Sequence, residues 1–178
     1  GFINPEPLRA LCKYLDAANI DLKGFTEDYY VQMTEGNLNP VLEALKIIKE
    51  EGVHLEITTL LVPGHNDDEP SLMRMCQWIR DNLGPDVPVH FSRFFPTYRL
   101  IHLEPTPLEV LEKARTIAVS CGLKFVYIGN APGNPSENTY CPSCSRIVVR
   151  RTGFSVSEVN IVQGKCAFCG EEIAGVWE

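Results

Sequence analysis

The chain has 178 residues, 44% of them hydrophobic, which is enough to bury a core and to hold a moderate domain beside a smaller one. Its net charge of −7 argues against a general nucleic-acid surface, because phosphate binding depends on clustered Lys and Arg. No apolar run reaches the length of a membrane span and no signal peptide is visible. We therefore expect a cytoplasmic protein with neither nucleic acid nor membrane as a partner.

Helices and strands alternate regularly along the first 128 residues. Apolar spacing and capping residues predict helices over residues 5–15, 29–33, 40–51, 69–83 and 107–121. Runs of alternating polarity predict strands over residues 17–23, 54–62, 87–95 and 124–128. This order is typical of parallel strands joined by right-handed crossovers, with the helices packed outside. The expected fold class is therefore α/β.

Polar side chains line one face of successive strands, which a doubly wound sheet covered on both faces would not show. These residues are Asn19, Asp21, Lys23, Glu56, Thr58, His90 and Ser92. Such a face is typical of a barrel lumen that holds a polar ligand. Four strands do not close a barrel, and the opening segment from Gly1 resembles a loop that follows a strand. We expect residues 1–133 to be the C-terminal half of a partial (β/α) barrel whose first strands are missing.

Two Cys-x-x-Cys pairs mark residues 134–178 as a small zinc-ribbon-like β module. The four candidate ligands are Cys141, Cys144, Cys166 and Cys169. Each pair directs two thiolates at one metal, and the interval between the pairs contains two strand-like runs, 146–150 and 154–162, joined at residues 152–153. A glycine- and proline-rich segment, 129–135, links this module to the barrel. Its basic residues are interpreted as a solvated face.

Two disulfides, or a redox-active pair, are the alternatives to zinc. Three further cysteines, Cys12, Cys76 and Cys121, occur singly in apolar helical stretches, and nothing marks the chain as secreted. One pair would suffice for redox chemistry, whereas two pairs in one hairpin module indicate shared ligation. The sequence therefore favours Zn²⁺ over either alternative.

Four motifs, together with the cysteine pairs, carry a family resemblance over essentially the whole chain. They are residues 19–24 (NIDLKG), 60–67 (LLVPGHND), 90–96 (HFSRFFP) and 127–130 (YIGN). In combination they resemble the C-terminal portion of the AmmeMemoRadiSam system radical SAM enzyme. That group is similar to the pyruvate formate-lyase activating enzymes.

The resemblance implies an iron-sulfur enzyme in which a [4Fe-4S] cluster cleaves S-adenosylmethionine to a 5′-deoxyadenosyl radical. The radical then abstracts hydrogen from a small molecule or from a protein substrate. The family holds its cluster with a Cys-x-x-x-Cys-x-x-Cys loop, and this spacing does not occur in the sequence. The resemblance therefore predicts that the cluster ligands lie outside this chain, which alone is expected to be inactive.

Four residues are candidate cofactor contacts. Asp21 and Lys23 match the Asp-x-Lys strand that, in the activating enzymes, contacts the methionyl carboxylate. Two residues apart on a strand, they share a face and can hold an amino-acid zwitterion; a structural salt bridge is the alternative. Thr58 stands where the activating enzymes tend to carry arginine, and His90 has the same lumen-facing parity. The zinc ribbon would serve stability or docking of a protein partner.

A function of another class also remains open. The chain would then be a non-enzymatic zinc-ribbon binding module on an α/β scaffold. The polar lumen argues against this reading, because buried polar groups cost stability unless a ligand or partner satisfies them. The sequence therefore favours a fragment of a radical SAM enzyme.

Overall fold

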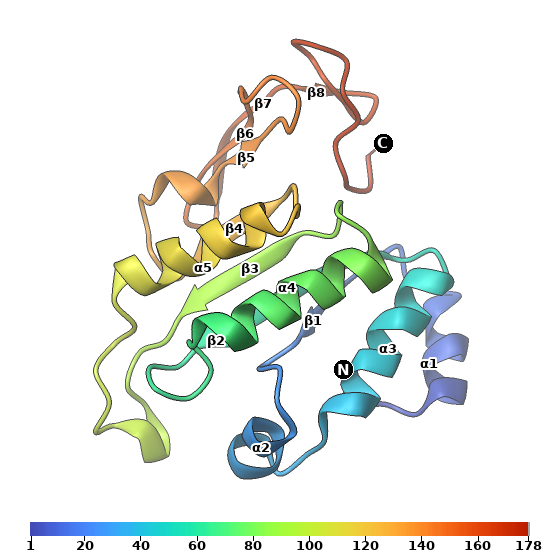
Figure 1. Cartoon of the computed structure of the whole chain (residues 1–178). Coiled ribbons are helices and arrows are strands. Elements are labelled where there is room, and N and C mark those ends of the chain that lie inside the picture. Colours follow the sequence, from blue (N-terminus) through green and yellow to red (C-terminus); the bar gives the residue numbers. More distant parts are fainter. Residues whose placement is uncertain (178) are drawn as a thin grey trace.

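Four parallel strands form the main sheet of the computed structural model, which describes residues 1–177 (Figure 1). They are β1 (Ala17–Asp21), β2 (His54–Leu61), β3 (Val89–Arg93) and β4 (Val126–Gly129), hydrogen-bonded in that order. The register places Asp21 opposite Thr58, and Thr58 opposite His90. The predicted α/β class with parallel strands is confirmed.

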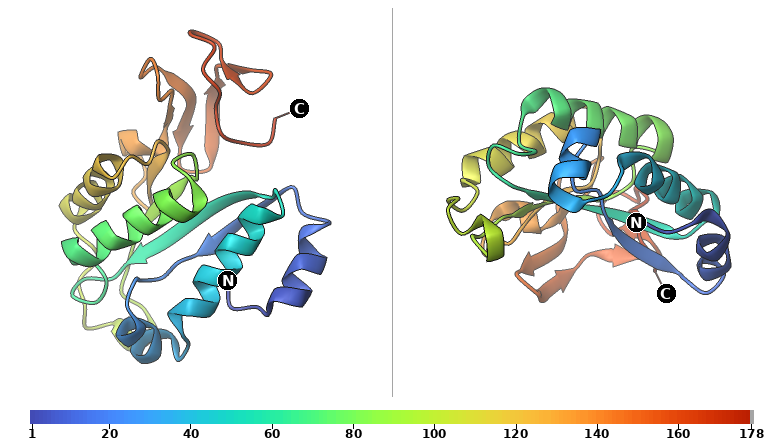
Figure 2. Two further views of the ribbon diagram at one scale, coloured as in Figure 1. Left: turned by 45° about the vertical axis from the view of Figure 1, so that its right-hand side comes forward. Right: turned by 90° about the horizontal axis from the view of Figure 1, so that it is seen from below.

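Helices cover one face of this sheet (Figure 2). They are α1 (Pro5–Cys12), α2 (Glu27–Tyr29), α3 (Leu38–Glu50), α4 (Glu69–Leu83) and α5 (Leu108–Ser120). Asp68 caps α4 by accepting a hydrogen bond from the Ser71 amide, and the helix stops at Gly84, whose φ of 99° suits glycine. None of the helices within residues 1–177 combines the length and apolar content that a membrane crossing requires.

The two-sided character predicted for the strands is clearest in β2. Leu55, Ile57, Thr59 and Leu61 are buried toward the helices, whereas the residues between them are partly exposed. Because successive side chains point to opposite faces, apolar packing against α3 and α4 fixes which polar residues reach the other face. That opposite face is called the lumen face below.

Several predicted boundaries were wrong by a few residues. Strand β1 ends at Asp21, so Lys23 lies just beyond it, and β3 spans Val89–Arg93 instead of residues 87–95. Helix α3 begins at Leu38, which places Pro40 in its first turn, where the missing amide hydrogen would have no partner anyway. The predicted helix at 29–33 is a π-helical turn, Tyr30–Thr34, that follows α2.

Residues 139–177 form a small antiparallel β unit, the ribbon. Its strands are β5 (Thr139–Tyr140), β6 (Ile147–Thr152), β7 (Ser155–Val159), β8 (Ile161–Val162) and β9 (Lys165–Cys166). The β6–β7 pair confirms the predicted hairpin, but the expected run 154–162 is split at Asn160, whose amide bonds the Val148 carbonyl at 2.7 Å. A shared apolar cluster, which includes Phe125 just before β4, joins the ribbon to the main sheet. Seen from below, the ribbon lies on the side opposite the helices (Figure 2).

Candidate functional site

The two Cys-x-x-Cys turns bring four thiols together in the ribbon. All four sulfur atoms lie within 4.8 Å of one another. The Sγ atoms of Cys141 and Cys169 are 3.5 Å apart, and those of Cys144 and Cys166 are 3.8 Å apart. A disulfide needs about 2.0 Å, whereas a tetrahedron of thiolates each about 2.3 Å from one metal has edges of about 3.8 Å. The four cysteines therefore fit a single metal ion, and these distances are too long for disulfides.

The two turns have the same backbone geometry. The amide of Ser145 donates to the Cys141 carbonyl at 2.9 Å, and the amide of Gly170 donates to the Cys166 carbonyl at 2.9 Å. Both residues are left-handed, with φ of 59° and 79°. Each left-handed residue closes its turn so that two thiols point the same way, which explains why glycine occurs at one of these positions.

Asp21 and Lys23 are together at the C-terminal end of β1. Lys23 Nζ lies 2.7 Å from Asp21 Oδ2, and both side chains are about half exposed. The backbone of Lys23 is held on both sides, because its amide donates to the Tyr30 hydroxyl at 3.1 Å and its carbonyl accepts from Asn66 Nδ2 at 2.6 Å. The structure thus places a fixed, accessible charge pair where the sequence predicted a zwitterion contact.

Asn66 is a buried residue whose role the sequence did not indicate. Its Nδ2 also donates to the Leu60 carbonyl at 2.8 Å, while its Oδ1 accepts from the Val62 amide at 2.7 Å. One side chain therefore ties the ends of β1 and β2 to the loop at residues 62–66. The motif 60–67 was noted in the sequence, but nothing in it showed where the amide points.

Polar residues on the lumen face form one hydrogen-bonded row. Thr58 Oγ1 donates to Asn19 Oδ1 at 2.8 Å, and Asn19 Nδ2 donates to Glu56 Oε2 at 3.4 Å. His54 and His90 approach Glu56 from two strands, with Nε2 atoms 3.6 and 3.0 Å from its oxygens. Thr58, which lies opposite Asp21 in the sheet register, is thus linked through Asn19 to this carboxylate.

Hydrogen bonding from the two histidines controls the charge of Glu56. The contact with His54, followed by that with His90, holds the pKa of the Glu56 carboxyl well below its usual range, although burial acts in the opposite direction. The His90 ring also stacks on Tyr127, with centroids 4.8 Å apart and planes 18° apart. The predicted ligand contact His90 is thus positioned by neighbours on both sides.

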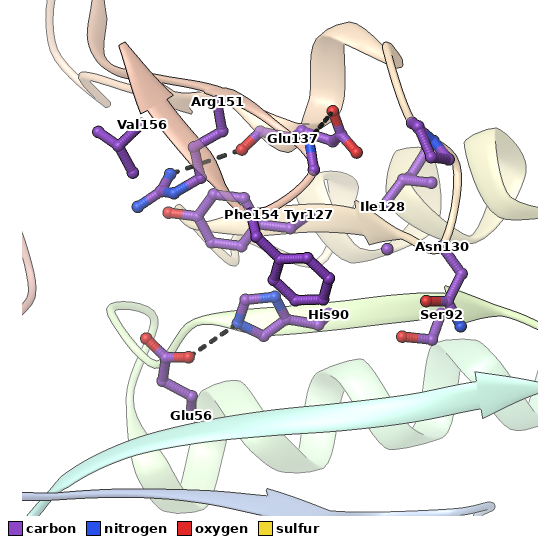
Figure 3. Close-up of a pocket in the computed structure, with 13 residues that line it drawn as sticks. Glu56, His90, Ser92, Tyr127, Ile128, Asn130, Glu137, Arg151, Phe154 and Val156 are labelled. Atoms are coloured by element: carbon purple, nitrogen blue, oxygen red, sulfur yellow. Dashed lines mark hydrogen bonds and ion pairs between the residues drawn. The ribbon is translucent and has the colours of Figure 1, made fainter. Parts of the chain in front are cut away.

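Two larger clefts meet these residues, beside a smaller one of about 390 Å³ that both Asp21 and Lys23 line. A cleft of about 1050 Å³ at the C-terminal ends of the strands is lined by Lys23, Arg93 and the loop at residues 94–100. In (β/α) barrels this end of the strands carries the active site. A second cleft, of about 520 Å³, lies between the lumen face and the ribbon (Figure 3). Lys23 and His90, predicted together, therefore line different clefts.

Comparison with known proteins finds one family model that matches part of the chain. Residues 1–76 match the family model of the Radical SAM superfamily. An uncharacterized protein of Methanocaldococcus jannaschii is 46% identical over 175 residues, which are 97% of this chain and 52% of that protein. The chain thus spans about half the length of the curated relative it matches.

Two solved structures share the fold. A domain of a pyruvate-formate lyase-activating enzyme from Bacteroides vulgatus matches with a TM-score of 0.63 and 16% identity, over 71% of this chain and 75% of that one. A radical SAM methyltransferase from Sphaerobacter thermophilus matches with a TM-score of 0.58 and 13% identity, over 70% of this chain and 37% of that one. At these identities the likeness concerns the fold.

Proposed function

We propose that this chain is part of a radical SAM enzyme and supplies one wall of the cavity that binds S-adenosylmethionine and substrate. The family match over residues 1–76 and the fold shared with two radical SAM proteins support this assignment. The observation that carries it is the polar lumen face, where the Asp21–Lys23 pair lies in register beside Thr58, and Thr58 is linked by hydrogen bonds through Asn19 and Glu56 to His90.

The iron-sulfur cluster does not fit the residues of this chain. The sequence has no Cys-x-x-x-Cys-x-x-Cys loop, and its clustered thiols converge on a single ion. The ligands of the [4Fe-4S] cluster would come from outside the chain. We assign the four thiols to Zn²⁺ instead, because tetrahedral sulfur ligation suits zinc.

The Asp21–Lys23 pair is the proposed contact for the amino-acid part of the cofactor. A carboxylate would bond the Lys23 ammonium and an α-amino group would bond Asp21, each by a charge-assisted hydrogen bond. Both groups are accessible, and the Lys23 backbone is fixed by Asn66 and Tyr30, so little ordering is needed on binding. In this role the two residues position the cofactor; hydrogen abstraction is not assigned to any group of this chain.

Equilibrium binding of S-adenosylmethionine to the intact, cluster-loaded protein tests the proposal. Asp21→Asn and Lys23→Ala should each raise the dissociation constant roughly ten- to a hundredfold, since a hydrogen bond to a charged group contributes about 1.5–3 kcal/mol. Thr58→Val should have a smaller effect. Lys13→Ala removes an exposed lysine outside both clefts and serves as the control. Unchanged affinity in both the Asp21 and Lys23 variants would reject the contact.

A binding module without catalytic activity is the competing function. The ribbon exposes Phe154, Val156 and Val159, an apolar group that a protein partner could cover. An intact protein that holds zinc but binds no S-adenosylmethionine would favour this reading over the enzyme.

A further inference from the structure

The second cleft is built by two parts of the chain that are far apart in sequence. Strands β2, β3 and β4 contribute Glu56, His90 and Tyr127, and the β6–β7 hairpin contributes Arg151 and Phe154 (Figure 3). Its volume of about 520 Å³ lies within the range of small-molecule sites. The ribbon is therefore a wall of this cleft as well as a metal-binding unit.

Phe154 is an aromatic residue that the fold alone does not explain. It stands at the tip of the two-residue turn between Thr152 and Ser155, where small polar residues are usual, and it is fully exposed. No other aromatic ring of residues 1–177 stacks on it. Figure 3 shows its ring directed across the cleft toward His90. A flat ring between these two side chains would remove apolar surface from water.

The turn that carries Phe154 is anchored to the linker. Glu137 Oε2 accepts hydrogen bonds from the amides of Gly133 at 3.1 Å and Gly153 at 3.3 Å. Gly153 has a φ of 57°, the left-handed conformation that glycine adopts without strain. The exposed ring is thus presented by a turn with defined bonds.

Arg151 supplies positive charge to the same cleft. Its Nη1 donates to Thr139 Oγ1 at 2.6 Å, and its guanidinium lies over the Tyr127 ring, with Cζ 5.9 Å from the centroid. Among residues 1–177 no carboxylate lies within ion-pair distance of it. A guanidinium has five N–H donors, so donors remain for a carboxylate or phosphate.

The two carboxylates of the cleft leave that charge available. Glu56 is paired with the histidines, and Glu137 is occupied by the two backbone amides. At the floor, Ser92 Oγ lies against Gly129, where a Cβ atom would come 2.9 Å from it. The cleft therefore combines an unpartnered ring with an unpaired cation.

We propose that this cleft binds a small molecule that carries an aromatic or heteroaromatic ring and an anionic group. The ring lies between Phe154 and His90, and the anion bonds Arg151. This inference goes beyond the proposed function and does not rest on cofactor binding. A simple aromatic anion and a nucleotide share the required chemistry, and the experiment separates them.

Binding of matched probes to the intact, zinc-loaded protein tests the proposal, with protein NMR to locate each probe. Phenyl phosphate should bind at least about tenfold tighter than cyclohexyl phosphate, which lacks the aromatic ring, and than benzyl alcohol, which lacks the charge. Shifts should centre on Tyr127 and Gly129. Adenosine 5′-monophosphate binding tighter than phenyl phosphate would identify a nucleotide as the ligand, and the reverse order a simple aromatic anion.

Variants assign the contacts. Phe154→Ser, which removes no packing because the ring is exposed, should weaken phenyl phosphate binding at least about tenfold. Arg151→Gln should do the same while leaving benzyl alcohol affinity unchanged. Tyr14→Ser, at another exposed aromatic, should change nothing.

Three results would overturn the proposal. One is the absence of phenyl phosphate binding at millimolar concentration, and another is equal affinity in the wild type and Phe154→Ser. The third is displacement of the probe by S-adenosylmethionine, which would show that the cleft binds the cofactor. If the protein fails to bind S-adenosylmethionine, the proposed function is wrong, but the phenyl phosphate test still decides whether this cleft binds an aromatic anion.

Discussion

Glu56 on β2 and His90 on β3 lie next to each other across two parallel strands, with Glu56 Oε2 3.0 Å from His90 Nε2. His54 approaches the other carboxylate oxygen from the same strand as Glu56. The pKa of the Glu56 carboxyl is held well below its ordinary value of 4.5, chiefly by these hydrogen bonds. The lumen face therefore keeps an anion at its centre at every pH near neutrality.

This anion should make stability depend on pH. Because the folded-state pKa is depressed, the stabilisation from Glu56 is fully present above its unfolded-state value and is lost as pH falls below it. Glu56→Gln should lower the unfolding free energy by about 1 kcal/mol near pH 7, a figure discounted for partial exposure. The difference from the wild type should shrink below about pH 4.5. Urea unfolding of both proteins, from pH 7 to below pH 4.5, measures this difference in unfolding free energy.

Glu43→Gln is the matched control, since Glu43 is exposed on α3 and makes no ion pair within residues 1–177. Its unfolding free energy should differ little from the wild type at any pH. A Glu56→Gln difference that is as large well below pH 4.5 as it is at pH 7 would show that the carboxylate charge contributes nothing.

The ribbon should carry about one zinc ion per chain. Cys166→Ser should abolish it, because a four-thiolate site loses its geometry with one ligand and metal binding is coupled to folding of the hairpin. Cys12→Ala is the control, since Cys12 is buried in α1 outside the cluster. Elemental analysis of the purified proteins gives the metal and its stoichiometry. Unchanged metal content in Cys166→Ser would refute the assignment.

Substitutions at the equivalent positions of the two Cys-x-x-Cys turns, Ser145 and Gly170, should have opposite effects. Gly170→Ala should weaken the ribbon by about 1 kcal/mol, because the left-handed backbone disfavours a Cβ atom although nothing lies within 4 Å of it. Ser145→Gly should leave stability unchanged or raise it slightly, since it relieves the same strain. Competition between the ribbon and a chelator for the metal, monitored by absorbance, compares the stability of the two variant ribbons. Equal effects of both changes would contradict the conformational explanation.

The parts of the fold that follow from local pattern could be predicted. The alternation in β2 and the apolar spacing of α3 and α4 determine which face each strand buries, and this placed Asp21, Thr58 and His90 on the lumen face. The Cys-x-x-Cys spacing likewise determines which thiols converge. Both signals extend over only a few residues, so one sequence suffices to detect them.

Contacts between distant segments could not be predicted. Tyr127 and Arg151 form one wall because the ribbon packs on Phe125, the residue before β4, which in the sequence is only another apolar residue of the predicted strand. Asn66 bonds backbone atoms of three segments, and no spacing rule shows the direction of a side-chain amide. These features depend on how folded segments pack against one another, and local periodicity does not determine that packing.

The Asp21–Lys23 pair should contribute little to stability, which separates a ligand contact from a structural salt bridge. Both side chains are about half exposed, and exposed pairs contribute roughly 0–1 kcal/mol. In a double-mutant cycle of Asp21→Asn and Lys23→Ala, urea unfolding should therefore give a coupling energy below about 0.5 kcal/mol. Asn66→Asp places a carboxylate against the backbone carbonyls of Lys23 and Leu60, which accept hydrogen bonds from the Asn66 amide. It should cost about 2 kcal/mol or more, which shows that the assay detects buried contacts at these strand ends. A coupling energy above about 1.5 kcal/mol would instead make the pair a structural element of the β1 terminus.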